Sequence, residues 1–77
     1  MAKITFALVK SNTDSVDSIF GTLKSLYEYA RLKYTDFGSY HIEELEDGEM
    51  VETCNLSYFM NSYKVNKITL NEYLYDN

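Results

Sequence analysis

The dipeptide Asp47-Gly48 limits the folds open to this chain more than any other feature of its sequence. A two-residue hairpin turn of type I′ needs positive φ at both central positions, and Asp-Gly is one of the few pairs that accept it readily. We therefore predict a β-hairpin over residues 39–54. With this turn, the facing pairs are Leu45 with Met50, Ile42 with Thr53, and His41 with Cys54.

A second strand is predicted at residues 3–9, where apolar side chains fall on both faces of an extended chain. Ile4, Phe6 and Leu8 alternate with Thr5, Ala7 and Val9. A strand that is apolar on both faces is typical of the interior of a sheet rather than its edge. We therefore expect this strand to be central.

The longest helical pattern runs from residue 13 to residue 34. Its apolar residues are three or four positions apart throughout: Val16, Ile19, Phe20, Leu23, Leu26, Tyr27 and Ala30. This spacing predicts one amphipathic helix, with Asn12 or Thr13 as N-cap and an end near Tyr34. Gly21 lies inside the predicted helix.

The last third of the sequence is less regular. Residues 55–63 fit a short helix or an irregular strand, and residues 63–70 resemble a final strand. Thr69-Leu70-Asn71-Glu72 has the pattern of a capping box, which predicts a short C-terminal helix through Leu74. The predicted fold is α+β, a small antiparallel or mixed sheet of three to four strands with one long amphipathic helix on one face. At 77 residues the chain has room for a single domain, 1–77.

Charge and cysteine content exclude several classes of function. Twelve acidic and seven basic residues give a net charge of −5, which argues against direct binding to nucleic acid or to an anionic membrane surface. No stretch approaches the ~20 apolar residues that a membrane-spanning helix needs. Cys54 is the single cysteine, so no intramolecular disulfide can form. A small secreted domain normally carries several disulfides, so we expect a reducing, intracellular and cytoplasmic setting.

The sequence contains no pattern that indicates an enzyme or a cofactor site. His41 and Cys54, as facing residues of the predicted hairpin, could form a pair that activates a thiolate, but no motif supplies an orienting group or an oxyanion site. His41, Glu43 and Glu52 are a thin ligand set for a metal. Glycine-rich phosphate-binding motifs are absent. We therefore expect no catalysis and no cofactor.

Acidic residues are concentrated in the predicted hairpin. Between Lys33 and Lys64 there is no Lys or Arg, and six carboxylates lie within ten residues: Glu43, Glu44, Glu46, Asp47, Glu49 and Glu52. A row of carboxylates on a strand could meet a basic surface of a partner and speed association with it. It could equally serve solubility and protect an edge strand from aggregation. The charge pattern leaves both interpretations open.

Tyrosine is the second unusual component, with eight residues in the chain. On the predicted helix, Tyr27 joins the apolar face and Tyr29 points away from it. Tyrosine is favoured in protein interfaces because it combines apolar area with a hydrogen-bonding tip. We predict Tyr29, Tyr58 and Tyr63 as partner-binding residues together with the six hairpin acids. The alternative is that the tyrosines fill a small core and its rim.

These features predict a small acidic module that works by protein–protein interaction. In size, charge and lack of catalytic motifs the chain resembles the small acidic proteins with which bacteriophages and mobile elements inhibit host or defence proteins. The resemblance implies an inhibitor of a protein with a basic surface, acting by steric blocking through the tyrosines or by nucleic-acid mimicry through the hairpin. It carries over no functional residue, because no motif is shared. A self-associating regulatory or assembly module is the alternative, in which a strand edge pairs across a two-fold axis.

Overall fold

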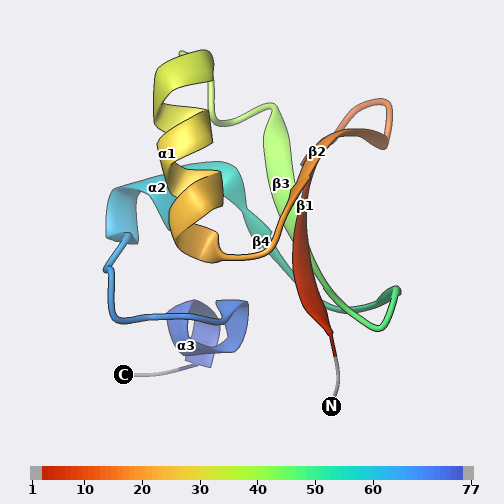
Figure 1. Ribbon diagram of the computed structural model, residues 1–77. Helices are drawn as coiled ribbons and strands as arrows, with labels where there is room; N and C mark the ends of the chain where they lie inside the picture. Colours follow the sequence, from red (N-terminus) through yellow and green to blue (C-terminus); the bar gives the residue numbers. More distant parts are fainter. Residues whose placement is uncertain (1–2, 76–77) are drawn as a thin grey trace.

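The computed structural model describes residues 3–75 as one four-stranded antiparallel sheet with three helices on one face (Figure 1). The strand order is β2-β1-β3-β4. The elements are β1 (Ile4–Lys10), β2 (Ser15–Phe20), α1 (Leu23–Lys33), β3 (Tyr40–Glu46), β4 (Glu49–Asn55), α2 (Leu56–Ser62) and α3 (Leu70–Tyr75). The predicted α+β class is confirmed. The single long helix is confirmed only in part, because α1 has 11 residues and α2 a further 7.

β1 is central in the sheet, as its two apolar faces predicted. It pairs with β2 along one edge and with β3 along the other. Phe6 and Leu8 belong to the core under the helices, whereas Ala7 and Val9, each 2% exposed, lie outside that core cluster. The residues on both faces of β1 are therefore buried, which is typical of a strand inside a sheet.

The β3–β4 hairpin forms around Asp47 and Gly48, which both have positive φ (52° and 87°). Leu45 lies opposite Met50, as predicted. Beyond that pair the predicted register is wrong by one residue: Ile42 lies opposite Cys54, and His41 opposite Asn55. A bulge between Glu44 and Leu45 causes the shift, because an extra residue on one strand displaces every later pair.

The first half of the predicted helix is wrong, because residues 15–20 form the edge strand β2. A turn at residues 11–14, with Asp14 at a φ of 53°, reverses the chain so that β2 pairs with β1. This pairing satisfies the backbone groups on the second flank of β1, which a helix would leave without partners. Gly21 therefore lies between strand and helix, and Thr22 is the N-cap of α1 in place of Asn12 or Thr13. The helix ends before Tyr34, as expected.

Residues 56–75 contain two short helices and no strand. Asn55 caps α2 through a hydrogen bond that its side chain accepts from Tyr58 N at 2.9 Å. The predicted strand at residues 63–70 is wrong: this segment is an irregular linker between α2 and α3. The predicted C-terminal helix is confirmed as α3, and the Glu72 carboxylate accepts hydrogen bonds from Thr69 Oγ1 and Ile68 N, both at 3.3 Å.

The hydrophobic core lies between the sheet and the three helices. Its most deeply buried side chains come from the sheet and from all three helices, namely Leu8, Ile42, Leu26, Leu56, Phe59 and Leu70. Phe59 contacts the ring of Tyr73 edge-on, with the centroids 5.0 Å apart. Within residues 3–75, no helix is long and apolar enough to cross a membrane.

Candidate protein-binding surfaces

One face of the sheet is covered by no helix. α1, α2 and α3 all lie on the opposite side, as Figure 1 shows. By the strand register, Ala7 lies beside Ile19 and Glu43, and Val9 lies beside Val16 and His41. We call this surface the open face and define it by Ala7, Val9, Val16, Ile19, His41, Glu43, Leu45 and Met50.

Large apolar side chains are exposed on the open face. Val16, Ile19 and Met50 are 55%, 58% and 56% exposed, respectively. Val16 and Ile19 lie beside Val9 and Ala7, which are buried, whereas Met50 lies beside Leu45 on the other side of β3. A shallow hollow lined by Thr5, Ile19 and Leu45 continues this surface toward Lys3 and the Asp47-Gly48 turn. Val16 and Ile19 are neighbours on this face of β2, and neighbouring exposed apolar side chains can mark interaction sites in proteins.

The polar residues on the open face form a hydrogen-bonded row. The side chains of Ser11 and His41 are 2.8 Å apart, between Oγ and Nδ1. His41 Nε2 is 2.9 Å from Glu43 Oε2. The imidazole is therefore held on both nitrogens, and it fixes the carboxylate of Glu43 beside the apolar residues.

The predicted pair of His41 and Cys54 does not form. His41 lies on the open face opposite Asn55, whereas Cys54 lies opposite Ile42 in the core. Burial, and secondarily the charge of Glu52, raise the pKa of the Cys54 thiol. The thiolate that nucleophilic chemistry requires is therefore disfavoured.

The six hairpin acids do not form one exposed row. Glu44 is 6% exposed and accepts a hydrogen bond from the buried Leu70 N at 2.8 Å, so the fold uses this carboxylate internally. Asp47 accepts a hydrogen bond from Lys3 N at 2.9 Å. Sequence spacing could not reveal these roles, because it does not show that α3 begins above Glu44.

Two pairs of like charges face each other across the hairpin. Glu46 lies opposite Glu49, and Glu44 lies opposite Glu52. Glu46 and Glu49 are exposed, and no Lys or Arg among residues 3–75 forms an ion pair with either. Like charges directly opposite in a sheet are destabilising, so this end of the hairpin is an uncompensated negative pole.

The predicted tyrosines lie in three separate environments. Tyr29 packs against Phe20 at the core margin, with ring centroids 5.1 Å apart, so the expectation that it points away from the core is wrong. Tyr63 stacks on Tyr27 with centroids 3.9 Å apart. Tyr58 is half exposed and donates a hydrogen bond to Tyr73 O at 2.9 Å. Most of this tyrosine surface serves the packing of the helices.

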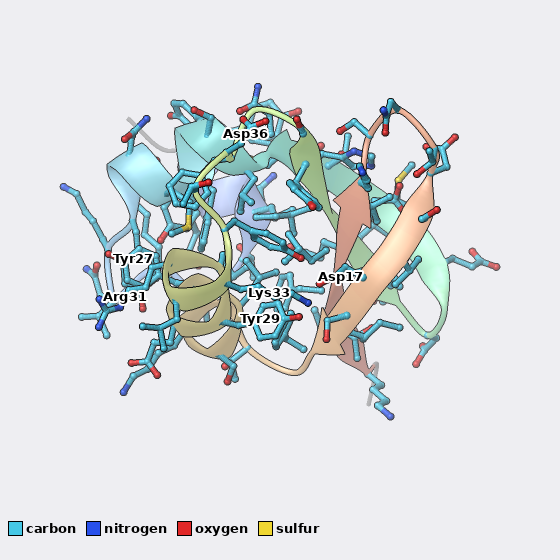
Figure 2. The ribbon with its side chains drawn as sticks, turned by 90° about the horizontal axis from the view of Figure 1, so that it is seen from above. Asp17, Tyr27, Tyr29, Arg31, Lys33 and Asp36 are labelled. Atoms are coloured by element: carbon cyan, nitrogen blue, oxygen red, sulfur yellow. The ribbon has the colours of Figure 1, made fainter. Side chains whose placement is uncertain are left out.

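Asp17 organises a cluster that the sequence did not predict. Figure 2 shows Asp17, Tyr29 and Lys33 pointing toward one another from β2 and α1. Asp17 Oδ2 accepts hydrogen bonds from the hydroxyls of Tyr29 (2.9 Å) and Tyr34, and lies 3.5 Å from Lys33 Nζ. The hydrogen bond from Tyr34 is the main cause that lowers the pKa of Asp17. The cluster ties the edge strand β2 to α1.

Metal binding finds no support in the arrangement of ligating side chains. The register places Glu52 opposite Glu44, whose side chain reaches α3, and not beside His41 and Glu43. Across residues 3–75, no group of three His, Cys, Asp or Glu side chains could hold a metal ion.

Comparisons with known proteins give no relative for this chain. No family model, no curated protein sequence and no solved structure matches it. Its function is therefore argued from its own residues.

Proposed function

We propose that the chain is a small acidic module that binds a partner protein through the open face of its sheet. The observation that carries the proposal is the exposure of Val16 and Ile19 on one edge strand and Met50 on the other, each more than half exposed on a face that no helix covers. Covering these side chains would remove apolar area from water, which drives protein association. Exposed apolar side chains also occur outside the sheet, among them Leu32 on α1 and Val65 and Ile68 in the linker before α3.

The acids at the end of the hairpin give the proposed partner its chemical character. Glu46 and Glu49 lie at the margin of the sheet, beyond Leu45 and Met50. A partner with an apolar patch and a basic rim would cover the open face with its patch and neutralise this negative pole with its rim. Charge at the rim of an interface contributes chiefly to the rate of association and to specificity.

Steric blocking is the mode of action that these features support best. The resemblance in size and charge to the inhibitors of bacteriophages and mobile elements favours an inhibitor of a host or defence protein. Nucleic-acid mimicry is a second proposal, favoured by the exposed, unpaired Glu46 and Glu49. Mimicry could use fewer than the six carboxylates of the hairpin, because Glu44 is buried. Within this proposal the chain acts in a reducing, intracellular compartment, which its single buried thiol supports.

The test compares matched variants in an affinity capture followed by measurement on the purified partner. The double variant Val16→Thr/Ile19→Thr keeps β-branched side chains in β2 while it removes apolar area, and Leu32→Gln is the control on α1. We expect at least about a 30-fold loss of affinity for the double variant, the size of a hot-spot effect, and none for the control. Equal binding by all three proteins would contradict the proposal.

Two further arms separate the modes of action. Glu46→Gln/Glu49→Gln abolishes binding if the hairpin mimics nucleic acid, and only slows association if the open face carries the affinity. Sedimentation velocity on the isolated chain tests the alternative of self-association. A mass that doubles with concentration, and returns to that of a monomer in Val16→Thr/Ile19→Thr, would make a second copy the partner.

A further inference from the structure

A separate apolar pocket lies at the edge of the helix-covered side, away from the open face. Its walls are the start of β1, the junction of β2 with α1, and the linker to α3: Ile4, Phe6, Gly21, Thr22, Leu23, Lys67, Ile68 and Thr69. The cavity volume is about 350 Å³, within the range of small-molecule sites. Phe6 and Leu23 are each 2% exposed and form its floor, whereas Ile68 is 69% exposed.

Gly21 lines the pocket and is itself exposed. A Cβ placed on Gly21 would meet no atom within 4 Å, and its φ lies outside the positive range that side chains avoid. Neither the backbone conformation nor a close neighbour therefore requires glycine here.

Among residues 3–75, Lys67 is the only charged residue that lines the pocket. Its side chain is half-buried, and Nζ lies 5.0 Å from the centroid of the Tyr73 ring. The two ion pairs of residues 3–75 involve Lys33 and His41, so no carboxylate in this range lies within 4.0 Å of Lys67 Nζ. In a protein of net charge −5, a lysine that lines an apolar pocket and has no carboxylate of residues 3–75 within 4.0 Å of its Nζ is complementary to an external anion.

We propose that this pocket binds a small amphipathic carboxylate, with its apolar body on Phe6 and Leu23 and its carboxylate at Lys67. Such a ligand would cover the exposed Ile68 and give Lys67 a partner of opposite charge. The site is independent of the open face, so it would add a ligand-binding activity to a protein-binding module.

Octanoate is the probe, added to the full-length, ¹⁵N-labelled chain and followed by amide chemical shifts. We expect saturable shifts at residues 4–6, 21–23 and 67–69. 1-Octanol should bind about tenfold more weakly than octanoate if Lys67 pairs with the carboxylate. Lys67→Gln should remove this preference, while Lys10→Gln, a lysine outside the pocket, should leave it unchanged.

Filling the pocket gives the second arm. Gly21→Leu should weaken octanoate binding at least about tenfold, and Gly21→Ala by less. Gly38→Ala is the matched control, because an added Cβ there meets only Asp36 Oδ1, at 3.4 Å. Octanoate shifts that are scattered over the surface, or unchanged affinity in a folded Gly21→Leu or Gly21→Ala variant, would overturn the site. Equal binding of octanoate and 1-octanol would overturn the role of Lys67.

Discussion

The two faces of the sheet use similar side chains for opposite purposes. Ile42 on β3 is fully buried under the helices, whereas Ile19 on β2 is 58% exposed on the open face. Both faces carry large apolar side chains, so the presence of such residues does not by itself separate them. The difference is that three helices complete one face, while the other has no covering element (Figure 1). A small chain that leaves an apolar face bare retains the surface that a binding partner needs.

The sharpest way to break this comparison is to truncate the two isoleucines. Ile42→Ala should lower the free energy of unfolding by about 2–5 kcal/mol, because it leaves a cavity in the core. Ile19→Ala should cost less than about 1 kcal/mol, because water already reaches most of its side chain. Urea unfolding followed by circular dichroism measures both. Equal losses would mean that the open face is packed in solution.

A second test concerns Glu44, the charged residue inside the helix-covered side. Its carboxylate accepts the hydrogen bond of Leu70 N, at the start of α3. Glu44→Ala leaves this buried N–H without a partner and should cost about 1–3 kcal/mol. Glu43→Ala, one residue away on the open face, should cost less, because it loses only a partly exposed contact with His41. Thermal unfolding of both variants checks the contrast, and a smaller loss for Glu44→Ala would refute the capping role.

Local signals predicted the parts of the fold that depend on neighbours in sequence. The turn at Asp47-Gly48, the end of α1 and the start of α3 each follow from residues within one turn of chain. The helix prediction for residues 15–20 was wrong because Val16, Ile19 and Phe20 fit a helical period. Only pairing with β1 makes this segment a strand. The bulge that shifts His41 away from Cys54 has no signal of its own in the sequence.

The candidate surfaces follow the same rule. The acidic hairpin is evident in the sequence, but the carboxylates that the fold itself uses are not. The role of Glu44 depends on the position of α3, whose Leu70 N donates a hydrogen bond to it. Asp17 was placed in a helix, so its cluster with Tyr29 and Tyr34 could not be foreseen. The open face became visible only when all three helices were found on the same side.

The Asp17 cluster predicts a pH dependence on the edge strand. The pKa of Asp17 is lowered in the folded protein, mainly by the Tyr34 hydroxyl. The stabilisation is therefore present above the ordinary value of 3.8 and is lost as the pH falls through the folded pKa. Because Asp17 is exposed, the effect should stay below about 1 kcal/mol. Below pH 4, the free energy of unfolding of Asp17→Asn should depend less steeply on pH than that of the unmodified protein. An unchanged pH dependence would contradict the role of Asp17.

The smallest expected effect tests why the hairpin keeps its like charges. Glu49→Lys places an ammonium opposite Glu46 and should stabilise the chain by about 0.2–1 kcal/mol. The double variant Glu46→Lys/Glu49→Lys restores a pair of like charges and should lose that gain, which separates pairing from the change in net charge. Unfolding in low salt measures both variants, since salt screens exposed charges. If Glu49→Lys is more stable, the acidic pair lowers the stability of the isolated chain. That result would favour a role for the pair in recognising a basic partner, together with the open face. If neither variant changes stability, the pair is neutral, and solubility explains it as well as binding does.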